Sequence, residues 1–94
     1  MGYLRHAKRS DLNQATIVQA LRSAGARVWV LGQPLDLLVG FRGRLVMLEV
    51  KSHKRTRADQ AHQTELIYEC QTEGLPVFRV ESPEDALRAI GATA

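Results

Sequence analysis

The segment from Asp36 to Lys51, DLLVGFRGRLVMLEVK, is the most informative part of this chain about its fold. It contains two apolar runs rich in β-forming residues, 37–41 and 45–50, separated by the turn sequence RGR. Two such runs around a glycine-centred turn predict a β-hairpin. Because both runs are almost continuously apolar, we expect the two strands to be covered on both faces.

The turn also predicts which residues face each other across the hairpin. If Arg42 and Gly43 form a two-residue turn, the numbers of paired residues add up to 85, and Asp36 lies opposite Glu49. Side chains alternate along a strand, so Lys51 shares the face of Glu49. Two carboxylates and one ammonium group are therefore expected to converge at one end of an apolar hairpin.

The rest of the chain predicts three helices and two more strands. Asp11 and Gln14 have the spacing of a capping box and would begin a helix over 12–24. The sequence Ser82-Pro83-Glu84-Asp85 is a strong start for a short helix that ends at Ile90. The remaining elements are a helix over 59–73 and strands over 28–31 and 76–80. The order α-β-β-β-α-β-α predicts a single small α/β domain, with helices packed on a mixed sheet that contains the antiparallel hairpin and one right-handed parallel crossover.

The size and composition of the chain limit its class. With 94 residues it fits one domain at 11–94, preceded by a flexible basic arm at 1–10, and domains this small often gain stability by dimerising. No apolar stretch approaches the roughly 20 residues of a membrane span. The single cysteine, Cys70, excludes an intramolecular disulfide and suits a reducing cytoplasm. Three aromatic residues are expected in the core or at a dimer interface: Trp29, Tyr68 and Phe78.

The charge is distributed unevenly along the chain. Residues 1–58 hold eleven Lys and Arg against three Asp and Glu, whereas residues 59–94 hold two against seven. This asymmetry indicates an anionic partner, nucleic acid before a membrane surface. Since only 5% of residues are aromatic, a base-stacking platform is not evident, and duplex or branched DNA fits better. The residues expected to contact DNA are Arg5, Lys8, Arg9, His53, Lys54, Arg55 and Arg57.

The convergence of Asp36 and Glu49 needs a chemical explanation. Opposed like charges destabilise a strand pair, and carboxylates beside an apolar core lose hydration. A divalent cation relieves both costs, and Mg²⁺ is commonly held by one or two carboxylates with water and substrate phosphate. Lys51 would then stabilise charge in the transition state or position the attacking water. The alternative is that Asp36 caps a strand, while Glu49 and Lys51 form an ordinary surface salt bridge.

These residues resemble a known family. Pro34-Leu35-Asp36, followed by Glu49-Val50-Lys51, resembles the signature of the PD-(D/E)xK nucleases. The continuation, with Gln60, Gly74 and Ser82-Pro83-Glu84, resembles the VRR-NUC and Holliday-junction-resolvase-like branch of phages and bacteria. The resemblance covers about residues 11–91 and implies a restriction-endonuclease-like core. It also implies branched DNA as the substrate and a homodimer.

The resemblance assigns roles to individual residues. Asp36, Glu49 and the backbone carbonyl of Val50 would hold Mg²⁺ or Mn²⁺, and Lys51 would be the catalytic lysine. Gln60 would reach toward the site or a DNA phosphate, or else be an exposed residue of the first helical turn.

Two positions depart from the family pattern. Leu35 separates the usual Pro-Asp pair. Gln14 stands where the family often has a helix-one glutamate, and it is either a weaker metal ligand or only the capping partner of Asp11. His53 is either an auxiliary proton carrier or a loop residue near phosphate.

The sequence thus predicts a Mg²⁺- or Mn²⁺-dependent DNA endonuclease in the cytoplasm of a bacterial or phage-infected cell, with no organic cofactor and no membrane partner. One alternative is a DNA-binding module of nuclease fold that cleaves weakly or not at all, of which Gln14 would be the sign. Another is a structural or interaction protein in which the Glu-x-Lys triplet occurs by chance.

Overall fold

The computed structural model describes residues 9–51 and 57–93, with side chains for residues 12–51 and 61–93. The elements follow in the predicted order: α1 (Arg9–Ser23), β1 (Arg27–Val30), β2 (Leu37–Phe41), β3 (Arg44–Val50), α2 (Arg57–Thr72), β4 (Val77–Val80) and α3 (Pro83–Ile90). The prediction of one small α/β domain is confirmed.

One four-stranded mixed sheet forms the centre of the domain, in the order β1-β2-β3-β4. β1, β2 and β3 are antiparallel neighbours, and β4 joins β3 in parallel after the crossover through α2. The hairpin turn has positive φ at both central residues, 49° at Arg42 and 79° at Gly43, which is the two-residue type I′ geometry. The pairing of Leu37 with Leu48 and of Phe41 with Arg44 confirms the predicted register.

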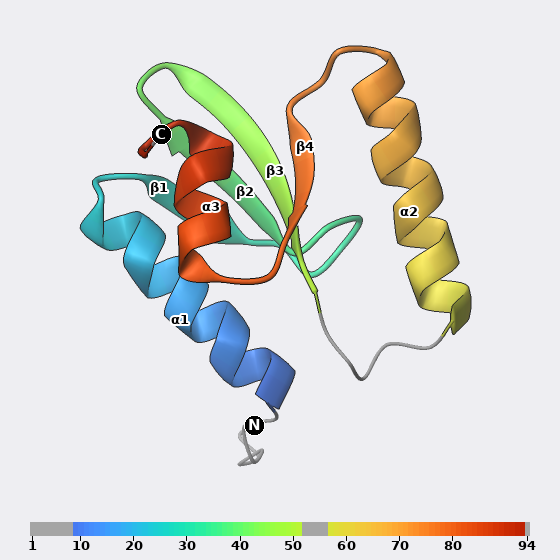
Figure 1. The fold of residues 1–94 in the computed structure, drawn as a ribbon, viewed down its shortest axis with the longest axis horizontal. Helices are drawn as coiled ribbons and strands as arrows, with labels where there is room; N and C mark the ends of the chain where they lie inside the picture. The colour runs from blue at the N-terminus through green and yellow to red at the C-terminus, as the bar shows by residue number, and fades with distance from the viewer. Residues whose placement is uncertain (1–8, 52–56, 94) are drawn as a thin grey trace.

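The helices cover the two faces of the sheet unequally. α1 and α3 lie together on one face, and α2 lies on the other (Figure 1). The larger core cluster lies between the sheet and the pair α1 and α3, and it includes Ile17, Leu21 and Leu48. A smaller cluster beneath α2 contains Leu35, Ile67 and Val77. Of the two hairpin strands, β2 is covered on both faces as predicted, but Leu45 of β3 is exposed.

The predicted start of the first helix is wrong. Asp11 lies inside α1, which already includes Arg9, so Asp11 is not the N-cap. Arg9 and Ser10, which the predicted arm includes, are helical in α1. Residues 1–8 of the expected arm lie outside the described part of the chain.

Predictions about the helix ends and the aromatic residues had mixed outcomes. α3 begins as predicted: the Ser82 hydroxyl accepts a hydrogen bond from the Asp85 N–H at 3.1 Å.

Phe78 packs partly buried against the core. Trp29 and Tyr68 are 50% and 70% exposed, so a core position is wrong for both. None of the helices among the described residues has the length and apolar character needed to cross a bilayer.

Candidate active site

The hairpin brings Asp36 and Glu49 together at its open end. Asp36 directly precedes β2, and Glu49 is the second-last residue of β3, one position beyond the Leu37–Leu48 pair. Both are buried, with 5% and 1% of their surface exposed. Glu49 stands two residues after Met47, which packs in the cluster beneath α2, so its side chain points to the α2 face of the sheet.

Reciprocal hydrogen bonds link the two carboxylates to the backbone of the opposite strand. The Val50 N–H donates to Asp36 Oδ2 at 2.8 Å, and the Asp36 N–H donates to Glu49 Oε1 at 3.2 Å. The Asp36 carbonyl also accepts from the Leu31 N–H at 2.8 Å, which ties the end of β1 to the same point. The positions of both acids are therefore fixed by three consecutive strands.

This geometry gives Asp36 two possible functions. In the first, its carboxylate continues the β2–β3 ladder by one hydrogen bond and so caps the strand. A ladder end does not require two buried acids, however, because any backbone carbonyl supplies the same acceptor. Burying two neighbouring carboxylates costs stability unless a cation or donors compensate the charge. Two carboxylates fixed side by side also offer oxygen ligands of the kind that hard divalent cations prefer.

Lys51 follows Glu49 at the same edge of the sheet. Its N–H donates to the Val80 carbonyl at 2.8 Å, which continues the parallel β3–β4 ladder. Its ammonium group forms an ion pair with Glu81, with Nζ and Oε2 3.1 Å apart. The alternative of a surface salt bridge between Glu49 and Lys51 is wrong, since Glu49 is buried and Lys51 pairs with Glu81.

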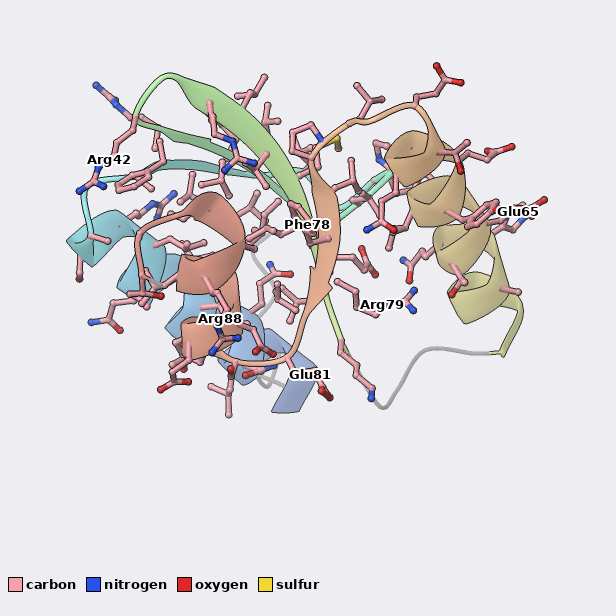
Figure 2. All side chains as sticks on the ribbon, turned by 45° about the horizontal axis from the view of Figure 1, so that its top comes forward. Arg42, Glu65, Phe78, Arg79, Glu81 and Arg88 are labelled. Atoms are coloured by element: carbon pink, nitrogen blue, oxygen red, sulfur yellow. The ribbon has the colours of Figure 1, made fainter. Side chains whose placement is uncertain are left out.

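Two further residues at this edge of the sheet, Arg79 in β4 and Glu81 directly after it, belong to none of the predicted motifs. Arg79 pairs in register with Glu49, and its guanidinium donates to the Thr64 hydroxyl at 3.1 Å. Figure 2 shows Arg79 extending between β4 and α2, and Glu81 at the end of β4. The parallel crossover was predicted from the sequence but its register was not. Only that register places Arg79 beside Glu49 and Glu81 beside Lys51.

Gln14 is half-buried on α1. With Val18 of the same helix and Val30 of β1 it lines an open cavity of about 590 Å³. Val30 pairs with Leu37, whose side chain packs in the core under α1 and α3, so this cavity lies on the face of the sheet opposite the one to which Glu49 points. Because Asp11 is not an N-cap, the capping-box alternative for Gln14 is wrong. Its role as a metal ligand stays a prediction.

Several of the predicted site residues cannot be placed. Gln60 lies in the first turn of α2, and Arg9 and Arg57 are the first residues of α1 and α2, but their side chains lie outside the described part. The remaining expected DNA contacts lie wholly outside it: Arg5, Lys8, His53, Lys54 and Arg55.

A second cavity adjoins the loop that leads to Asp36. It has a volume of about 600 Å³ and lies between Gln33 and Pro34 on one side and the helix α2, including His62 and Glu65, on the other. Among the described side chains, no three His, Cys, Asp or Glu residues are grouped closely enough to hold a metal ion. A cation at Asp36 and Glu49 would therefore need further ligands from the backbone, from water or from a substrate.

Comparison with models of known protein families, with characterised proteins and with solved structures gives no match. The resemblance to PD-(D/E)xK nucleases thus stays a prediction from motifs and spacing, and the functional argument depends on the site itself.

Proposed function

We propose that this protein is a Mg²⁺- or Mn²⁺-dependent endonuclease that hydrolyses DNA phosphodiesters. The observation that carries the proposal is the buried pair of Asp36 and Glu49, held by reciprocal backbone hydrogen bonds, with Lys51 at the same sheet edge. Buried like charges at a fixed separation are costly for stability but suited to a cation.

The residues present fit a hard divalent cation. Asp36 and Glu49 offer carboxylate oxygens, the ligand type that Mg²⁺ and Mn²⁺ prefer, and the Val50 carbonyl is the third protein ligand that the resemblance implies. Such a cation supplies Lewis-acid activation of a phosphodiester and of a water molecule. The ammonium group of Lys51 would contact a phosphate oxygen and stabilise negative charge as the bond to the leaving oxygen breaks. Gln60, in the first turn of α2, would orient the substrate or the attacking water.

The charge distribution favours DNA as the substrate. The basic N-terminal residues and the basic segment after Lys51 precede the two helices whose first residues are Arg9 and Arg57. Cations in these segments would neutralise backbone phosphates largely without regard to sequence, so binding should weaken steeply with salt. Preference for branched DNA, action as a homodimer and a bacterial or phage cytoplasm are parts of the proposal that depend on the family resemblance.

Cleavage of labelled four-way-junction, flap and linear duplex DNA tests the proposal, with Mg²⁺, Mn²⁺ or EDTA. The informative variants are Asp36→Asn, Glu49→Gln and Lys51→Ala, because the first two keep the shape of the side chain. Glu73→Gln, the same charge change at an exposed position, is the matched control. We expect cutting that requires metal, survives in the control and is lost in the three site variants. Metal-independent cutting, or cutting that survives in Asp36→Asn, would refute the proposed site.

A second candidate function is a DNA-binding module that cleaves poorly. It is favoured by the absence of a third acidic residue near Asp36 and Glu49 among the described side chains and by the amide at Gln14. Gln14→Glu separates the two functions: a large gain in metal-dependent cutting would mark the natural chain as a weak nuclease. DNA binding without cutting in both proteins would favour the binding module.

A further inference from the structure

The ammonium group of Lys51 contacts a carboxylate that none of the sequence motifs includes. Glu81 Oε2 lies 3.1 Å from Lys51 Nζ. The contact follows from topology: β3 and β4 run in parallel with Val50 beside Val80, so the next residue of each strand emerges at the same sheet edge. Both side chains are about half exposed, so an incoming ligand can reach the pair from solvent.

The backbone of Glu81 is held in place from two helices. Its N–H donates to Asp85 Oδ2 in α3 at 3.1 Å, and its carbonyl accepts from the Asn13 side-chain amide of α1 at 3.2 Å. Ser82, the next residue, is the N-cap of α3. Glu81 therefore projects from a fixed point beside Lys51, at the end of β4 in Figure 2.

The pair is close but easily broken. Exposed ion pairs add little to the stability of a protein, because solvent screens the attraction and two long side chains must be ordered. A phosphate oxygen and a carboxylate oxygen are equivalent acceptors for an ammonium group, since each carries negative charge and forms a charge-assisted hydrogen bond. An incoming phosphate can thus replace Glu81 on Lys51.

We infer that Glu81 occupies, in the free protein, the position on Lys51 that a phosphate oxygen of the nucleic acid takes in the complex. This inference rests on the proposed function, in which Lys51 contacts the substrate phosphate. Glu81 is then a specificity-determining residue. It weakens the binding of any single phosphate to Lys51, so that a substrate held by further contacts displaces it more readily than a lone phosphate does.

DNA binding in EDTA tests the inference without requiring cleavage. Fluorescence anisotropy with a labelled four-way junction compares the natural chain with Glu81→Gln, Lys51→Ala and the double variant. Glu84→Gln, an exposed acid three residues away, controls for the general change in charge. We expect Glu81→Gln to tighten binding roughly two- to fivefold at low salt, with little change in Glu84→Gln, and the gain to disappear in the Lys51→Ala background and at high salt.

A second measurement observes the pair directly. The ¹⁵N NMR signal of Lys51 Nζ should shift when inorganic phosphate is added, at lower phosphate concentrations in Glu81→Gln than in the natural chain. If Glu81→Gln tightens binding equally with and without Lys51, or no more than Glu84→Gln does, the inference is overturned. A Lys51 signal that does not respond to phosphate also overturns it.

The two proposals fail in different ways. Coupling between Glu81 and Lys51 in a protein that never cuts DNA would refute the nuclease and keep the inference. Metal-dependent cutting without that coupling would keep the nuclease and refute the inference.

Discussion

Replacement of Asp36 by asparagine separates a cation site from a strand cap. In the natural chain the Val50 N–H donates to Asp36 Oδ2 at 2.8 Å. The change to asparagine keeps the shape of the side chain and one acceptor oxygen for this N–H. It removes one of two opposed negative charges, of which the other, Glu49, is 1% exposed. Stability and metal binding should therefore change in opposite directions.

The size of the effect follows from the geometry of the pair. Opposed side chains of an antiparallel pair have Cβ atoms about 5 Å apart, and if the two carboxylates keep a similar separation their charges repel by roughly 3 kcal/mol at an effective dielectric constant of about 20. A hydrogen bond to a neutral acceptor is weaker than one to a charged acceptor by about 1 kcal/mol. We expect Asp36→Asn to raise the free energy of unfolding in EDTA by about 2 kcal/mol.

Metal should reduce this difference in the free energy of unfolding, because it stabilises the natural chain far more than Asp36→Asn. A cation present at ten times its Kd stabilises the natural chain by about 1.4 kcal/mol. For a domain of this size that corresponds to a rise in Tm of roughly 6–11 °C. Asp36→Asn should show little of this rise, because it lacks one of the two carboxylate ligands.

Thermal unfolding followed by circular dichroism, in EDTA and over a series of Mg²⁺ and Mn²⁺ concentrations, measures both effects. The Glu73→Gln control should retain the full response to metal. A variant Asp36→Asn that is less stable than the natural chain in EDTA would identify Asp36 as a structural cap. A natural chain whose Tm does not respond to either metal would refute the cation site.

Three further predictions concern the fold that holds the site. Leu48→Ala, at a fully buried position of β3, should lower the free energy of unfolding by about 2–5 kcal/mol in urea titrations, whereas Leu45→Ala, at 58% exposure, should cost far less. Ser82→Ala removes the hydroxyl that caps α3 and should cost about 1 kcal/mol, while Ser82→Asp should retain most of the stability. Gly43→Val places a β-branched residue at φ 79° and should lower Tm, and equal stability would contradict the type I′ turn.

The sequence alone determined the features that depend on local chemistry. The register of the hairpin follows from a two-residue turn and the alternation of side chains, so Asp36 could be placed opposite Glu49 without coordinates. The start of α3 follows from Ser82 and Pro83 in the same way. The start of α1 was placed too late, because Asp11 fits a cap by residue type while the helix already includes Arg9.

The tertiary structure decided the contacts between residues far apart in the chain. Lys51 and Glu81 are thirty positions apart, and their ion pair depends on how the crossover sets the register of β3 and β4. Trp29 is exposed because α2 packs over the β4 side of its sheet face, and nothing local to Trp29 indicates that. Turn and cap preferences act over a few residues and can be inferred from residue type. Parallel register and helix placement result from the packing of the whole core. The contact of Lys51 with Glu81 therefore could not be inferred from the sequence and required the tertiary structure.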